Sequence, residues 1–457
     1  MLRSGAGGRL EEIEASILNA FTLATCQDGF HCLKVANLLS SNALARDHST
    51  EIATKLETLA RHSERISEYL GAREYFNASS NWFKLSGDHE KWTAMTVEVA
   101  ECWAKEADVK LKSEQPSHGV AATYFEKAIQ TYRTIPRAMR AIHRVDDRIG
   151  ELRRYLNESG EKSLGEMGVI RSRGVDIGQI VEDARNSVKG KALDKALEAF
   201  VNELEGENFG RLRESTIKQI RSYPVQALFS ATVMKRDGRV IAKRPAVNLS
   251  TTLSDEDEAQ YNEEVVRSKM VENYRIHVDL AVRGYIWPVL EVLHMEHRLR
   301  EADFVDIARQ SPIVPIGREV LFDKALYAGY DRDYVTALHI LIPQIENMVR
   351  YHLKQAGVNT TNLDSNGIEN EIGLNSLMDL SETQEMFGED LSFEIEALFC
   401  DAIGPNLRNE LAHGLLDERA CESTAAIYAW WFGLKLVLNS FWNALRNDTE
   451  QNEQDEE

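Results

Sequence analysis

A short segment near the carboxyl end holds two side chains that together could cleave a phosphodiester bond. Arg408 and His413 stand five positions apart, and Asn409 follows the arginine directly. An arginine guanidinium is permanently charged and can hold a phosphate through two parallel hydrogen bonds. An imidazole with an ordinary pKa of about 6.5 can accept and donate protons at neutral pH. These residue types predict a site that binds a phosphate and moves a proton.

The spacing of the two residues sets a geometric condition on this site. Five steps along a regular helix turn the side-chain direction by about 140° and raise it by about 7.5 Å, so the two side chains diverge. They can meet at one phosphate if the helix begins near Arg408, or if a second copy of the chain supplies the opposing half. Gly404 and Pro405 precede the motif and are typical of a helix start. We therefore expect a new helix at Arg408 and favour a site that is shared across a dimer.

The pattern Arg408-Asn409-x-x-x-His413 resembles the signature of the HEPN superfamily (higher eukaryotes and prokaryotes nucleotide-binding). Further segments before it resemble a bacterial HEPN-like family that carries a long helical region ahead of the motif; they are residues 311–319, 328–330, 337–339, 342–346 and 407–414. The resemblance covers the last third of the chain. It implies a metal-independent ribonuclease that works as a homodimer through its carboxyl-terminal bundle, often in toxin–antitoxin or phage-defence systems. Some members of the superfamily have lost activity and serve as binding modules.

Two hypotheses about function follow from these residues. In the first, the 2′-hydroxyl of RNA attacks the adjacent phosphate, His413 acts as general base or acid, and Arg408 stabilises the charge that develops on the phosphoryl oxygens. Asn409 would position the phosphate or the histidine. In the second, the chain is a non-catalytic helical adaptor that binds a nucleotide or a protein partner. Arg408 and His413 would then cap and stabilise the bundle, or hold the nucleotide or an acidic group of the partner.

A long helix is predicted from Asp333 to about Gln355, because an aspartate cap precedes an apolar periodic run and Gly357 follows it. Glu346 and Arg350 stand one turn apart on this helix. They could face the motif, with Glu346 orienting Arg408 or His413. An ordinary ion pair on the helix surface explains the same spacing equally well.

The composition indicates a mainly α chain of several domains. A length of 457 residues with 43% apolar content exceeds what one core usually supports. We expect a helical, partly repeat-like region at 1–222, a β-hairpin with linking helices at 223–310, a HEPN-type helical bundle at 311–447 and an acidic disordered tail at 448–457. The five cysteines form no C-x-x-C pair, so we expect neither a metal nor another cofactor. No apolar run approaches the length of about 20 residues that a membrane span requires, so we expect a cytoplasmic protein.

The charge distribution is uneven. The net charge of −20 weighs against indiscriminate binding to nucleic acid. Nevertheless, Asp237-Gly238 between two β-rich runs predicts a hairpin whose turn carries Lys235, Arg236 and Arg239. This turn could contact RNA, or its charges could simply be solvated.

Two further helical patterns lie in the amino-terminal region. Ala121-x-x-x-Phe125-x-x-Ala128 has the spacing of the second helix of a tetratricopeptide repeat. It suggests a repeat-like region that serves as a platform for a protein partner or packs on the carboxyl-terminal domain. Arginines recur every three or four residues from Arg133 to Arg148. On one helix they would form a phosphate-binding stripe, although neighbouring carboxylates could pair with them instead.

Overall fold

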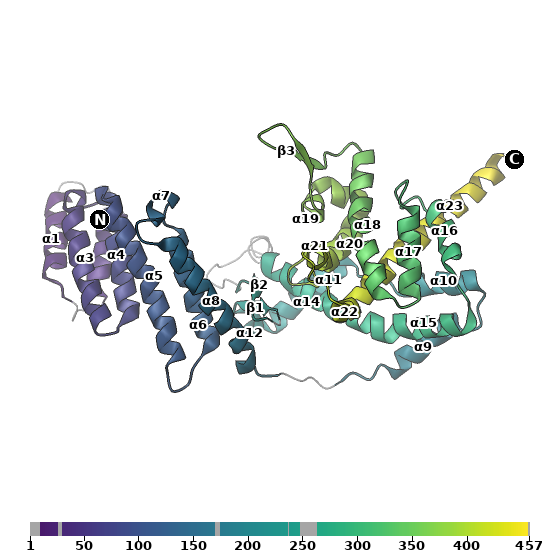
Figure 1. The fold of residues 1–457 in the computed structure, drawn as a ribbon, viewed down its shortest axis with the longest axis horizontal. Coiled ribbons are helices and arrows are strands. Elements are labelled where there is room, and N and C mark those ends of the chain that lie inside the picture. The colour runs from purple at the N-terminus through teal and green to yellow at the C-terminus, as the bar shows by residue number, and fades with distance from the viewer. Residues whose placement is uncertain (1–9, 26–29, 170–173, 236, 247–262, 456–457) are drawn as a thin grey trace. The chain divides into compact units, whose positions relative to one another are not determined.

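The computed structural model describes residues 10–25, 30–169, 174–235, 237–246 and 263–455, and it is mainly α (Figure 1). Two small two-stranded sheets, β1–β2 and β3–β4, accompany the helices in these residues. The expected fold class is thus confirmed. The chain divides into two compact units, one formed by Met1–Arg171 with Met234–Val240, and one formed by Ser172–Val233 with Ile241–Glu457.

The first unit is an array of helices in which most neighbours along the chain pack against one another (Figure 1). Its helices are α1 (Leu10–Leu23), α2 (His31–Ser41), α3 (Ser49–Arg65), α4 (Tyr69–Ser86), α5 (His89–Leu111), α6 (His118–Arg133), α7 (Arg137–Arg140) and α8 (Val145–Ser163), with 3₁₀ turns at Arg46–His48 and Leu164–Glu166. Ala121, Phe125 and Ala128 of α6 are all buried, so the pattern read from the sequence marks a packed helix face.

The arginines from Arg133 to Arg148 do not form one stripe, because the backbone breaks twice between them. Helix α6 ends at Arg133, Pro136 follows in an extended conformation, and Arg144 takes a left-handed φ of 49°. Arg148 then donates to both carboxylate oxygens of Glu101 at 2.7 and 2.9 Å. Proline and the left-handed turn therefore separate the arginines onto different helices.

The second unit contains the remaining elements. Its helices are α9 (Gly178–Val188), α10 (Leu193–Asn202), α11 (Phe209–Ser222), α12 (Pro224–Ala227), α14 (Glu263–Ala281), α15 (Trp287–Glu296), α16 (Glu301–Gln310), α17 (Glu319–Tyr330), α18 (Tyr334–Gln355), α19 (Leu374–Met378), α20 (Ser381–Ile395), α21 (Leu407–Ala412), α22 (Glu418–Cys421) and α23 (Thr424–Asp455). Single π-turns at η6 (Val282–Ile286) and η7 (Glu396–Cys400) follow α14 and α20.

The segment 172–222 belongs to this second unit, whereas the sequence grouped it with the amino-terminal region. The reason is contact with α23 across a long sequence separation. The indole Nε1 of Trp431 donates to the carbonyl oxygen of Phe200 at 3.1 Å, and Lys435 donates to that of Leu204 at 2.8 Å. Local periodicity cannot reveal such pairings.

Helix α23 forms the centre of the second unit. Tyr428, Trp430 and Trp431 are fully buried, so these aromatic side chains belong to the hydrophobic core. Gly329 on α17 lets the two helices approach, because a Cβ atom there would overlap the Trp430 ring. The helix continues to Asp455, where the sequence suggested a disordered tail.

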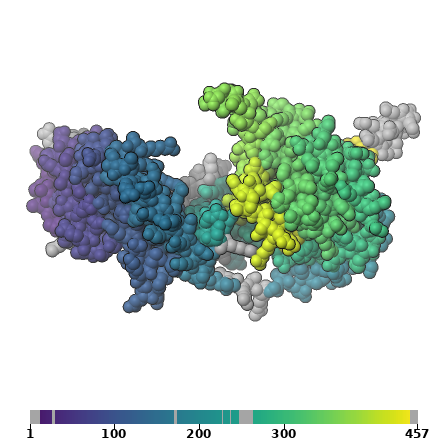
Figure 2. Space-filling model, viewed as in Figure 1, coloured from purple at the N-terminus to yellow at the C-terminus, as the bar shows by residue number. Residues whose placement is uncertain are grey.

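Both sheets are hairpins. β1 (Ala231–Met234) and β2 (Val240–Arg244) form the hairpin that the Asp237-Gly238 turn predicts. The second hairpin, β3 (Thr361–Leu363) and β4 (Glu369–Glu371), pairs Thr361 with Glu371 and Leu363 with Glu369. It projects as a light-green extension in Figure 2.

Candidate functional site

Helix α18 supplies the fixed wall of the candidate site. Its first turn is capped by Asp333, whose Oδ1 accepts from the amide of Thr336 at 3.0 Å. Its end is marked by Gly357 with a φ of +80°, a conformation that glycine adopts without strain. The predicted helix is thus confirmed nearly to the residue. Glu346 and Arg350 lie in its fourth and fifth turns.

The motif lies on the short helix α21, which begins at Leu407. Asn406 precedes it with a left-handed φ of 52°, and Leu407 is buried. Arg408 therefore lies in the first turn of a new helix, soon after Gly404 and Pro405. This is one of the two arrangements in which Arg408 and His413 could meet at one phosphate. His413 forms the other end of α21, and Gly414 follows it with a φ of 65°.

The structure brings Arg408, Glu346 and Arg350 together. The Nε atom of Arg408 donates to Oε2 of Glu346 at 2.7 Å, and Nη2 of Arg350 donates to Oε1 of Glu346 at 2.7 Å. The side chains of Glu346 and Arg350 are 16% and 14% exposed, and that of Arg408 is 27% exposed. Asn409 completes the cluster, because its Oδ1 accepts from Nη1 of Arg408 at 3.3 Å.

Charge balance in this cluster favours an anion. Burial alone would raise the pKa of Glu346, but hydrogen bonds from Arg408 and Arg350 outweigh it and hold the pKa below its usual value. Two carboxylates, Glu346 and Glu371, thus face three cations, which are Arg408, Arg350 and Lys354. Arg408 keeps part of its surface open to solvent, where the oxygen atoms of a phosphate could bind it.

Cys400 lies near Arg408 and Glu346, but its side chain is a protonated thiol at neutral pH. Burial, and then the charge of Glu396, raise the pKa of Cys400 to about 12. Only a thiolate is a good nucleophile. Cys400 therefore contributes packing and no chemistry.

His413 is exposed at the end of α21. Its backbone amide donates to the carbonyl oxygen of Asn409 at 3.1 Å. Within the described residues, its imidazole has no hydrogen-bond partner. The imidazole is therefore available to solvent and to a ligand.

Sequence reasoning missed the contribution of the β3–β4 hairpin. The carbonyl oxygen of Ile372 accepts from Nη2 of Arg350 at 2.6 Å, and Glu371 pairs with Lys354 and, at 3.2 Å, with Nε of Arg350. A Cβ atom on Gly373 would lie 3.2 Å from Nη2 of Arg408. The available signal was the turn pair Asn366-Gly367, which is typical of hairpins.

The hairpin β1–β2 holds the three basic residues that the sequence offered as a contact for RNA. Its turn belongs to the first unit, where Gly238 is buried and a Cβ atom on Gly160 of α8 would lie 2.5 Å from its carbonyl oxygen. Arg239 pairs with Asp237 at 2.7 Å, and Arg236 lies outside the described residues. The turn is thus packed against α8, while the role of Lys235, Arg236 and Arg239 in RNA binding stays a prediction.

Neither a metal cluster nor a membrane span is found in the described ranges. No group of three or more histidine, cysteine, aspartate or glutamate side chains there lies close enough to hold an ion. No helix among those residues combines the length and the apolar character that crossing a bilayer demands.

No protein-family model matches this sequence, and comparisons with curated proteins and with solved structures also found no match. The resemblance to the HEPN superfamily therefore depends on the motif and its surroundings alone.

Proposed function

We propose that the carboxyl-terminal unit is a metal-independent endoribonuclease of the HEPN type that acts as a homodimer, in a bacterial defence or toxin-like stress response. The observation that carries this proposal is the cluster around Arg408. Its guanidinium is fixed by Glu346 at 2.7 Å yet remains partly exposed, and an exposed imidazole stands at the other end of the same short helix. A fixed cation and an accessible proton carrier are the two parts that RNA cleavage requires.

The reaction would use only groups of the RNA and of the protein. The 2′-oxygen forms a bond to the phosphorus while the bond to the 5′-oxygen breaks, which yields a 2′,3′-cyclic phosphate and a 5′-hydroxyl. His413 takes the 2′-hydroxyl proton or supplies one to the leaving oxygen, and Arg408 stabilises the charge on the non-bridging oxygens. Asn409 fixes the guanidinium orientation. A twofold arrangement of two chains would supply one histidine from each side of the phosphate.

A second candidate is a non-catalytic adaptor that binds a nucleotide or a protein partner. One observation favours it: Glu346 already satisfies Arg408, so the cluster is stable without a ligand. The amino-terminal helical array is also typical of protein-binding platforms. In this case Arg408 and His413 would have no effect on RNA.

Cleavage of RNA in a chelator distinguishes the two candidates. Purified full-length chain is incubated with total RNA in EDTA, beside Arg408→Ala and His413→Ala. Arg419→Ala and His339→Ala are matched controls, because both side chains are exposed and lie outside the cluster. The proposal predicts cyclic phosphate ends with the wild type and both controls, and at least a hundredfold less cleavage with the two motif variants. Equal cleavage by all five proteins, or none by any, would favour the adaptor.

A further inference from the structure

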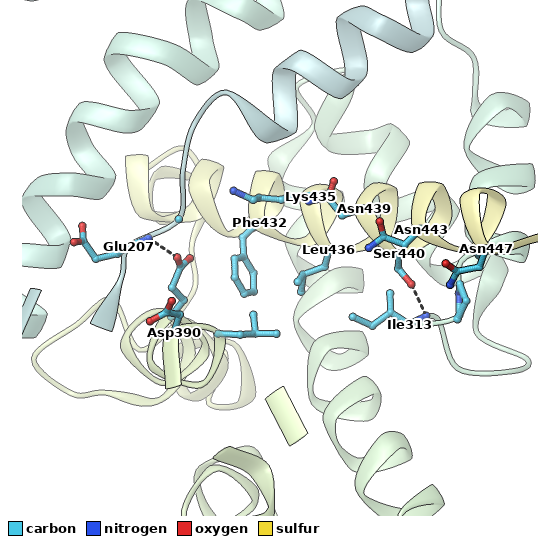
Figure 3. Close-up of a pocket in the computed structure, with 15 residues that line it drawn as sticks. Glu207, Ile313, Asp390, Phe432, Lys435, Leu436, Asn439, Ser440, Asn443 and Asn447 are labelled. Atoms are coloured by element: carbon cyan, nitrogen blue, oxygen red, sulfur yellow. Dashed lines mark hydrogen bonds between the residues drawn. The ribbon is translucent and has the colours of Figure 1, made fainter. Parts of the chain in front are cut away.

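A groove of about 580 Å³ runs along the last part of α23. Figure 3 shows how successive turns of this helix contribute to it, from Phe432 at one end to Asn447 at the other. These positions span about 22 Å at 1.5 Å per residue. The opposite wall comes from α20 and from the loop that holds Pro312 and Ile313. None of the motif residues lines this groove.

One half of the groove carries a row of amide groups. Asn439, Asn443 and Asn447 follow one another at four-residue intervals and all line the groove. Across the described parts of the chain, none of their side chains has a hydrogen-bond partner. An asparagine amide offers both a donor and an acceptor, as does each residue of a polypeptide backbone.

The spacing of this row fits an extended polypeptide. Four residues of a helix rise by about 6.0 Å, and two residues of an extended strand rise by about 6.6 Å. The mismatch of about 0.6 Å per step is within the range over which a hydrogen bond can adjust. A strand lying along α23 could therefore bind the three amides through every second residue.

The other half of the groove is acidic. Asp390, Glu207 and Glu394 line it, with Lys435 as the one cation among the lining residues. Burial raises the pKa of Glu394, and Glu207 pairs with His277 at 3.2 Å, so Asp390 carries the exposed negative charge of this end. Lys435 is occupied, because it donates to the carbonyl oxygen of Leu204 at 2.8 Å. Asp390 is exposed and accepts from the amide of Phe209 at 2.7 Å and from Nδ2 of Asn208 at 3.1 Å. A basic side chain would therefore meet its negative charge rather than an empty oxygen atom. This end suits a basic side chain and repels the phosphates of RNA.

The middle of the groove is apolar. Leu436 faces Leu391 and Ile313 there, and Ser440 accepts from the amide of Ile313 at 3.1 Å. Such a surface accommodates an aliphatic side chain between the acidic end and the amide row. The order of the three parts therefore specifies a ligand with a basic residue, then an apolar one, then a backbone held mainly by its peptide groups.

We propose that this groove binds an extended peptide segment of another protein, with a lysine or arginine beside Asp390 and the backbone on Asn439, Asn443 and Asn447. A groove of this length accommodates about six or seven residues at 3.3 Å each. The proposal goes beyond the nuclease function and holds whether or not the chain cleaves RNA.

Selection from a defined peptide library tests it. Full-length chain is immobilised and presented with a phage-displayed library of random dodecapeptides, in parallel with the double variant Asn439→Ala/Asn443→Ala. The wild type should enrich sequences that place Lys or Arg next to an apolar residue. A synthetic peptide of the enriched sequence should lose about tenfold in affinity for each single asparagine variant. Asn157→Ala, an exposed asparagine of α8, is the matched control and should bind like the wild type.

Two further arms identify the binding mode. N-methylation of the peptide at alternate residues should abolish binding in one register and leave it unchanged in the other, because only every second amide meets the row. Asp390→Asn keeps the acceptor for Phe209 but removes the charge, so it should weaken binding at low salt more than at high salt. The proposal is overturned if no sequence is enriched over the double variant, if the double variant binds the selected peptide equally, or if RNA crosslinks to this groove instead.

Discussion

Replacing Glu346 by glutamine tests whether the Arg408 cluster is held by charge. The carboxylate accepts from Arg408 and Arg350 at 2.7 Å each and is only 16% exposed. Glutamine has nearly the same shape, but its amide end presents donors to a guanidinium that also donates. Hydrogen bonds to a charged group contribute more than neutral ones, and an uncompensated partly buried cation is costly, so we expect a loss of about 2 kcal/mol in the free energy of unfolding.

The pH dependence of this loss follows from the direction of the pKa shift. The pKa of Glu346 is lower in the folded chain than its ordinary value, so the ion pair stabilises the fold fully above about pH 4.3, the unfolded value. This stabilisation is lost as the pH falls through the lower folded pKa. Glu346→Gln cannot ionise, so its deficit should be complete at pH 7 and should shrink below about pH 4.

Hydrogen exchange of α18 and α21 is the suitable assay, because a chain of two units need not unfold in one transition. The amides of both helices should exchange faster in Glu346→Gln than in the wild type at pH 7. Glu385→Gln, at an exposed position of α20, should leave them unchanged. Equal protection in the two variants, or a deficit that does not depend on pH, would refute the electrostatic explanation.

Further predictions concern packing, helix propensity and thiol reactivity. Gly329→Ala should lower the free energy of unfolding by about 1–3 kcal/mol, because the new methyl group overlaps Trp430. Gly150→Ala in α8, where a Cβ atom would meet nothing within 4 Å, should instead raise it by about 0.5–1 kcal/mol. Thermal melting of both variants checks this pair, and two shifts of the same sign would contradict the packing account. Cys400, whose pKa burial raises to about 12, should react with iodoacetamide at pH 8 far more slowly in the native chain than in urea, as measured by mass spectrometry of its peptide; equal rates would contradict the burial.

The sequence anticipated the elements whose signals are local. Asp333 and Gly357 bounded helix α18 because a cap and a left-handed stop act within a few residues. The turn at Asp237-Gly238 fixed the first hairpin in the same way. The contact of Glu346 with Arg408 is one of the two arrangements that the sequence left open. The four-residue interval between Glu346 and Arg350 fits an ordinary ion pair on the helix surface equally well.

The remaining features depend on long-range contacts or on single backbone angles. The β3–β4 hairpin was missed because Asn362 and Asn370 are poor strand formers, and its pairing is visible only once Asn366-Gly367 is taken as a turn. The arginine stripe failed at Arg144, whose left-handed φ of 49° no composition rule predicts. The segment 172–222 joined the second unit through α23, which follows it by more than 200 residues.

The central claim is that Arg408 and His413 act on the same phosphate, and a double-mutant cycle tests it most directly. Cleavage of one RNA substrate is measured as kcat/KM in EDTA for the wild type, Arg408→Ala, His413→Ala and the double variant. Groups that serve one transition state are strongly non-additive. The account predicts that the double variant is no slower than the slower single variant. The claim is contradicted if the losses in kcat/KM of the two single variants multiply in the double variant, or if either single variant cleaves as fast as the wild type.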